Sequence, residues 1–251
     1  MKSSNLNLKF IALFGLLAPC ISYAEYNISI GAEDFKWTED STNLKEKGRR
    51  YNIGVTTGTL LARPTGIFYE INANIYKGDI AYNISSPTNL VTTKTSYSGN
   101  KIEGKIAARL NHFDIAGTFG HETWSREIKS SKDNAGKVIP ATKEKFLQPY
   151  VKLGVGYFHY IKHDRARFEI GYKRPFQITK TNDDLDLDLS LAGLDSVYFQ
   201  YRYQSSNKWG VILYSEKTHL GKSKSILINN KAVNQPEAQT TALGATFTYR
   251  F

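Results

Sequence analysis

The sequence predicts an all-β protein, namely a transmembrane up-and-down antiparallel β-barrel of about ten strands. Three observations predict it. Apolar and polar residues alternate with a period of two from residue 26 onward. The connections between these segments alternate between short and long. The polar face carries charges of both signs, whereas the apolar face bears aromatic rings near its ends, which is the reverse of a soluble barrel.

The first 24 residues predict a signal peptide that is removed, which leaves 25–251 as the barrel domain. Lys2 and Lys9 precede a short apolar stretch at 10–18, and small residues lead to a cleavage site after Ala24. The apolar stretch is shorter than the roughly 20 residues that a spanning helix needs. Pro19 before Cys20 argues against a lipoprotein, and the mature chain would contain no cysteine.

Ten segments carry the two-residue alternation. In the first, Tyr26 and Ile28 alternate with polar residues, and in the third Ile67 and Ile71 lie opposite Glu70. The segments, in chain order, are 26–32, 49–61, 66–78, 101–110, 113–120, 149–158, 165–173, 197–204, 208–215 and 242–251. Eight or twelve strands remain alternatives, because 174–204 could hold a further hairpin.

The connections decide between a sandwich and a membrane barrel. The short ones lie at 62–66, 110–113, 161–165 and 204–208, and the long polar ones at 39–48, 79–100, 125–145, 174–193 and 218–238. Barrels that cross a membrane have tight turns on one side and long loops on the other. An unpaired backbone edge facing hydrocarbon is costly, so the first strand is expected to pair with the last.

The charged face is expected to point into the barrel and form ion pairs there. The predicted interior network is Glu70, Glu103, Lys105, Arg109, Asp114, Lys152, Arg167, Glu169, Arg202 and Arg250. The aromatic residues of the other face would lie at the headgroup level of the membrane, where rings are enriched.

The last strand resembles the assembly signal of Gram-negative outer-membrane barrels. Its apolar residues alternate up to a terminal aromatic ring, with Leu243, Phe247, Tyr249 and Phe251 in the pattern. The resemblance implies export to the periplasm, insertion by the barrel-assembly machinery and residence among the lipids of the outer membrane. The segments 45–55, 76–83, 147–160 and 169–176 also resemble a set of small barrels to which we attach no activity.

Two enzyme families suggest candidate catalytic residues. Omptin proteases are ten-stranded barrels with paired Asp residues and a His-Asp couple at the extracellular rim, but His163 and Asp164 lie in a predicted periplasmic turn. Lipid A deacylases use a His-x-Ser pair, which His121 and Thr123 resemble with threonine in place of serine. A histidine can activate a hydroxyl, yet we favour an interfacial ring and a β-forming residue.

An acidic run suggests a candidate metal site. Asp184, Asp186 and Asp188 share one face of an extended segment, and carboxylates are ligands for Ca²⁺. We favour solvated acids, or acids paired with Lys173, Arg174 and Lys180, because three acids in a line do not wrap an ion. No cofactor is predicted.

The chain carries a formal net charge of +10. Its predicted loops at 125–145 and 217–238 hold an excess of Lys and Arg, which could attract lipopolysaccharide phosphates or the sulfated host glycans bound by ten-stranded adhesins. No helix that could enter a DNA groove is predicted, so nucleic-acid binding is not expected.

Three functions follow as hypotheses. The favoured one is a non-enzymatic outer-membrane protein whose surface loops bind a partner or shape the surface. The alternatives are a narrow passive pore for small solutes and an outer-membrane enzyme acting on lipid A or peptides.

Overall fold

The computed structural model describes residues 24–39, 42–86, 89–132, 136, 138–182, 187–228 and 231–251. Residues 1–23 of the expected signal peptide lie outside them. Within the described part, no helix is long and apolar enough to span a membrane.

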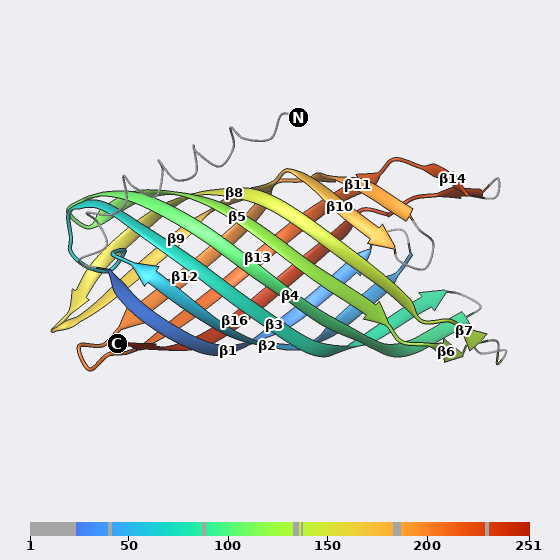
Figure 1. Cartoon of the computed structure of the whole chain (residues 1–251), viewed down its shortest axis with the longest axis horizontal. Coiled ribbons are helices and arrows are strands. Elements are labelled where there is room, and N and C mark those ends of the chain that lie inside the picture. Colours follow the sequence, from blue (N-terminus) through green and yellow to red (C-terminus); the bar gives the residue numbers. More distant parts are fainter. Residues whose placement is uncertain are drawn as a thin grey trace, which may run out of the picture.

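Ten long strands close into one antiparallel barrel, as the sequence predicts. Each strand pairs with its neighbour in the chain, and β16 pairs with both β13 and β1, so the wall has no open edge. The strands cross the long axis at a steep tilt (Figure 1). The barrel strands are β1 (Glu25–Glu39), β2 (Leu44–Gly58), β3 (Gly66–Ser86), β4 (Asn89–Leu110), β5 (Phe113–Ile128), β8 (Thr142–Ile161), β9 (Asp164–Pro175), β12 (Ser196–Gln204), β13 (Trp209–Ser223) and β16 (Ala238–Arg250).

A further hairpin extends the wall at one end, as the twelve-strand alternative anticipated in part. It consists of β10 (Gln177–Asn182) and β11 (Leu187–Gly193). β10 pairs with β8 beyond the end of β9, and β11 pairs with β13 beyond the start of β12. Each therefore continues a barrel strand after a short break and adds no strand to the circumference.

All four predicted short connections lie at one end of the barrel, and three of them are tight turns of two to four residues, whereas the first is longer and comprises residues 59–65. Asn111 and Lys162 open two of them with φ of 56° and 57°, the left-handed conformation typical of short hairpin turns. Both described termini lie at this end, which we assign to the periplasm because short turns face it in such barrels (Figure 1).

The predicted long loops are mostly strand, and this corrects the sequence-based prediction. β3 and β4 remain paired as far as Ser86 and Asn89, and only 40–43 separate β1 from β2. Polar residues in these segments suggested loops, but they alternate with inward apolar residues and extend the barrel beyond the membrane. Two small hairpins project further at this extracellular end, β6 (Ser131–Lys132) with β7 (Val138–Ile139) and β14 (Ile226–Ile228) with β15 (Lys231–Val233).

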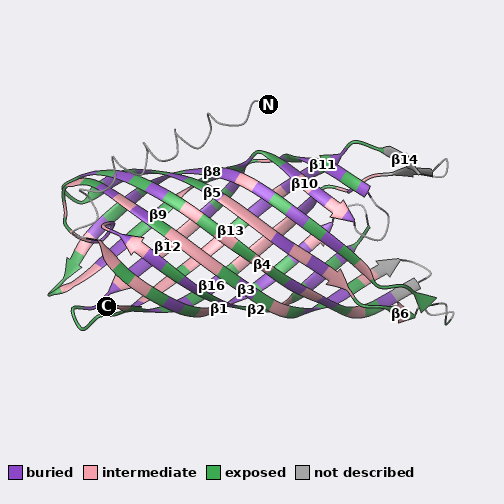
Figure 2. Ribbon diagram, in the orientation of Figure 1, coloured by how far each residue is buried: buried purple, intermediate pink, exposed green. Residues whose placement is uncertain are grey.

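Buried and exposed residues alternate along the strands around the whole wall (Figure 2). In the periplasmic half, the exposed face is apolar: Ile30, Ile53, Ile67, Ile106 and Leu153 are each at least 54% exposed. Large apolar side chains turned outward in a continuous band match a hydrocarbon environment. We call this band the apolar belt, and its further members include Ile28, Val55, Ile71, Ile75, Ile102, Phe119, Val155, Ile170, Phe247 and Tyr249.

Candidate functional site

The interior of the barrel at the level of the apolar belt is a network of ion pairs. Arg109 Nε lies 2.9 Å from Asp114 Oδ2, and Arg167 Nε donates to the same oxygen at 3.0 Å. Arg167 also pairs with Glu169, whose Oε2 accepts from Lys105 Nζ at 2.7 Å. Each buried charge therefore has a partner, which offsets the cost of removing it from water.

The other predicted interior residues also point inward. Arg202 forms a bidentate pair with Glu70 and Lys152 Nζ lies 2.8 Å from Glu103 Oε1. Arg250 lies at the periplasmic mouth, with Nη1 2.7 Å from Glu25 Oε1. What these residues do for the cell remains a prediction.

Several interior residues were missed in the sequence. Arg50 pairs with Glu33, and Glu216 Oε1 accepts from Lys173 Nζ at 2.6 Å. The tyrosines form a second missed group: Tyr214 donates to Glu33 Oε2, and Tyr76 to Glu122 Oε1, both at 2.7 Å. The pairing of strands brings these residues together, and their spacing in the sequence carries no sign of it.

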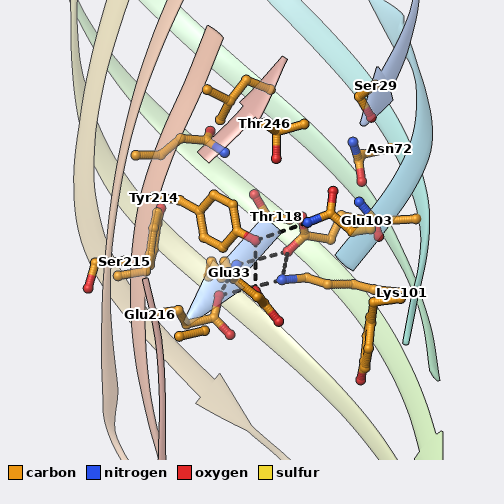
Figure 3. Close-up of a pocket in the computed structure, with 18 of the residues that line it drawn as sticks. Ser29, Glu33, Asn72, Lys101, Glu103, Thr118, Tyr214, Ser215, Glu216 and Thr246 are labelled. Atoms are coloured by element: carbon orange, nitrogen blue, oxygen red, sulfur yellow. Dashed lines mark hydrogen bonds and ion pairs between the residues drawn. The ribbon is translucent and has the colours of Figure 1, made fainter. Parts of the chain in front are cut away.

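A polar cavity of about 140 Å³ lies in the middle of the barrel (Figure 3). Carboxylates and cations balance along its wall. The acids are Glu33, Glu70, Glu103, Glu122 and Glu216, and the cations are Arg50, Lys101, Lys105, Lys152 and Arg202. Asn52 Oδ1 and Thr118 Oγ1 are buried at this wall without a protein partner. A cavity of this size and polarity suits several water molecules.

The extracellular half of the interior is mostly apolar, which the sequence-based interpretation did not foresee. Its central members are Trp37, Tyr97, Trp124 and Phe146, and the Trp124 and Phe146 rings stack with their centroids 4.8 Å apart. The remaining members are Phe35, Leu44, Tyr76, Ile80, Tyr82, Val91, Ile178, Leu187, Leu189, Leu191, Leu220 and Ala238. We call this set the apolar cap. Beyond the apolar belt, the inward face of the wall is therefore mostly apolar and the outward face is polar.

One ion-pair cluster crosses the apolar cap. Arg126 Nη2 lies 2.8 Å from Glu46 Oε1, and Arg126 Nη1 lies 2.8 Å from Glu144 Oε2. Lys180 Nζ lies 2.6 Å from Glu144 Oε1. Burial by itself would raise the pKa of Glu144, but Arg126 and Lys180 outweigh it, so the pKa lies below its ordinary value. The cluster ties β5 to β2, β8 and β10.

The turn between β2 and β3 folds into the periplasmic end of the barrel. Leu60 and Leu61 of this turn are buried, and Leu60 packs with Phe68 and Ala107. Arg109 donates to the carbonyl oxygens of Leu60 and Arg63, both at 2.9 Å, so the interior network holds the turn in place. We call residues 59–65 the periplasmic plug.

The candidate catalytic pair lies on the outer wall. His121 and Thr123 sit on the outward face of β5, where His121 is opposite Ile102 and Thr123 is opposite Asn100. No hydrogen bond joins the two side chains in the described part of the chain, and none joins His121 to a carboxylate. The outward position next to the apolar belt agrees with an interfacial ring.

The acidic run lies partly outside the described residues, which exclude Asp184 and Asp186. Asp188 accepts a hydrogen bond from Thr181 Oγ1 at 2.7 Å. Among the described residues, Lys173 pairs with Glu216, Lys180 with Glu144 and Arg174 with Asp195. Whether the acidic run is solvated or paired remains a prediction. Among the described residues, no group of three His, Cys, Asp or Glu could hold a metal ion.

The residues of the predicted assembly signal occupy the outward face of the closing strand. Leu243, Phe247 and Tyr249 alternate along β16 and are 61%, 50% and 42% exposed, and Phe251 follows at 68%. They therefore join the apolar belt.

Known structures share this fold. The outer-membrane protease OmpT from Escherichia coli superposes with a TM-score of 0.55 and 12% identity, over 91% of this chain and 96% of that one. The chain is an outer-membrane β-barrel. No family model and no curated protein matches the sequence.

Other similar structures are more distant. The translocator domain of the autotransporter NalP from Neisseria meningitidis has a TM-score of 0.45 and 10% identity, over 98% of this chain and 97% of that one. An outer-membrane channel from Pseudomonas putida F1 has a TM-score of 0.45 and 7% identity, over 90% of this chain and 96% of that one.

The closed barrel and its apolar belt place the protein in the outer membrane of a Gram-negative bacterium.

Proposed function

We propose that this outer-membrane barrel is a non-enzymatic, non-conducting surface protein that uses its extracellular hairpins as a rigid binding platform. The observation that carries the proposal is the apolar cap. Trp37, Tyr97 and Phe146 are almost completely buried inside the barrel above the membrane. A packed apolar interior excludes water and ions, so the extracellular half resembles the core of a soluble barrel more than the mouth of a channel.

The opposite end supports the same function. The periplasmic plug is held by Arg109 and by Arg165, whose Nη1 donates to the Leu61 carbonyl oxygen at 3.0 Å. The polar cavity between plug and cap has as many lining cations as carboxylates. A balanced cavity closed at both ends offers no net charge to attract an ion.

The described residues at the extracellular end of the barrel include few groups that could catalyse hydrolysis. His219 is on β13 at the extracellular end, and no carboxylate lies within ion-pair distance of a histidine in the described part of the chain. Hydrolytic barrels need such groups to orient or activate a nucleophile. OmpT is a protease by its name, but at 12% identity the likeness extends to the fold alone.

A narrow pore is the second candidate, and the polar cavity is the observation that favours it. A pore would require the apolar cap to move aside. The two functions therefore differ in one measurable quantity, the conductance of the folded barrel.

Planar-bilayer recording of the mature barrel tests the proposal. Wild-type protein should give no discrete conductance steps, in the same bilayers in which a reconstituted porin does. The double variant Arg202→Ala with Glu70→Ala removes a balanced pair and widens the polar interior, yet it should also remain silent because the cap is intact. Stable steps in wild type would refute closure, and steps only in the double variant would show that the ion pairs are the barrier.

Mass spectrometry of lipid A tests the enzymatic alternative. Cells that express wild type, cells that express His121→Ala and cells without the protein should give the same lipid A spectrum. An acyl chain lost only in wild-type cells would contradict the non-enzymatic proposal.

A further inference from the structure

The apolar belt contains a hollow on the wall formed by β16, β1, β2, β3 and β4. It has a volume of about 690 Å³ and is almost entirely apolar. Ala73 lies at its floor, between the larger Val55 and Ile102 that face it on the neighbouring strands. The other outward side chains that line it are Ile28, Ile30, Ile53, Ile75, Asn100, Phe247 and Tyr249. We call this hollow the wall groove.

Cations follow the groove on the same strands. Beyond Ile53, the outward positions of β2 are Tyr51, Arg49 and Lys47 in turn. Beyond Ile75, the first outward position of β3 is Lys77, which is directly opposite Tyr51. Strands rise about 3.4 Å per residue, so these cations lie roughly 7 to 20 Å from the groove along the wall. That is the layer just above the acyl chains.

Two acids on the same outward face, Asp34 of β1 and Asp79 of β3, offset only part of this positive charge. Lys36 of β1 is directly opposite Lys47 of β2. Like charges in this position repel and destabilise a sheet, unless something neutralises them. Asp34 is engaged with Arg49 at 3.4 Å, with both side chains more than 60% exposed, and a pair so open to solvent contributes little. We call Lys36, Lys47, Arg49 and Lys77 the basic cluster.

We propose that the wall groove and the basic cluster together bind one lipopolysaccharide molecule, with acyl chains in the groove and lipid A phosphates on the cluster. The groove faces outward in the apolar belt, so its ligand is a lipid. The basic cluster lies at the extracellular side of the belt, so this lipid belongs to the outer leaflet. Several cations side by side select more than one phosphate, which a phospholipid with a single phosphate does not supply. Charge-assisted hydrogen bonds to phosphate are among the stronger polar contacts. The site does not depend on whether the lumen is closed.

Native mass spectrometry of the mature barrel in detergent, titrated with deep-rough lipopolysaccharide, tests the proposal. The quadruple variant Lys36→Gln, Lys47→Gln, Arg49→Gln and Lys77→Gln should bind at least about tenfold more weakly than wild type. A matched control removes four other extracellular charges, Lys129→Gln, Lys132→Gln, Lys222→Gln and Lys224→Gln, and should bind within about twofold of wild type, since these side chains are not beside the groove.

A second variant tests the groove without changing charge. Ala73→Phe fills the hollow from the lipid side, where an aromatic residue is compatible with folding, and should weaken binding of the same lipopolysaccharide. Heat-dependent mobility on SDS gels shows which variants are folded. Equal binding by the quadruple variant and wild type would overturn the proposal. So would equal binding of wild type to dephosphorylated lipid A or to phosphatidylglycerol, because neither carries the paired phosphates.

Discussion

Replacing Trp37 with alanine tests the apolar cap most directly. Trp37 is 0% exposed, its ring centroid lies 5.6 Å from that of Phe146, and its Nε1 donates to Glu39 Oε1 at 3.1 Å. An indole buries on the order of 200 Å², which at about 25 cal/mol per Å² corresponds to about 5 kcal/mol. Alanine retains part of this contribution, so we expect a loss of about 3–5 kcal/mol in the free energy of unfolding.

The assay is equilibrium unfolding in guanidinium chloride of the barrel refolded in detergent, followed by its β-sheet circular dichroism. Trp209→Ala is the matched control, because Trp209 is 39% exposed on the outer wall. Detergent can fill the space that this indole leaves, so the control should lose less than half as much stability. If Trp37→Ala cost less than about 1 kcal/mol, or no more than Trp209→Ala, the extracellular half would not be a packed core.

Three further predictions concern the interior network, its pH dependence and assembly. A Cβ on Gly156 would lie 2.3 Å from Asp114 Oδ1, so Gly156→Ala should lower the unfolding free energy by about 1–3 kcal/mol, whereas Gly117→Ala, with nothing within 4 Å, should change it little. Because the pKa of Glu144 lies below its ordinary 4.5, its carboxylate stabilises the fold above that pH, and the stability should fall more steeply with further acidification in wild type than in Glu144→Gln, which retains the other ion-paired carboxylates. Phe251→Ala should reduce the amount of folded barrel in the outer membrane of cells while leaving refolding of the purified chain in detergent unchanged; equal reduction in both would assign Phe251 to stability instead of assembly.

Much of the fold could be predicted from residues that alternate along the chain. Ile67, Ile71 and Glu70 lie on the expected faces because successive side chains in a strand point to opposite sides. The short turns were predictable for a related reason: a hairpin turn is a local feature, and 161–165 lies between two unmistakable strands. The same local pattern placed Arg109 and Arg167 inside the barrel.

The environment that each inward residue enters could not be predicted in the same way. Trp37 and Glu33 alternate with outward polar residues in one strand, but one belongs to the apolar cap and the other to the polar cavity. The difference depends on how far each residue stands above the membrane, and that height follows from the tilt and register of the whole wall. The long paired extensions of β3 and β4 were mistaken for loops because their outward residues are as polar as those of a loop.

The sequence by itself determined that this chain forms a closed barrel with an apolar outer face. The reason is that the two-residue alternation and the charges on the opposite face are properties of neighbouring residues. Only the tertiary structure decided which charges meet and which side chains fill the lumen. Arg126 reaches Glu46 across 80 positions of the chain and Arg202 reaches Glu70 across 132. Such contacts depend on strand register around a complete circumference, and no local pattern in the chain encodes that register.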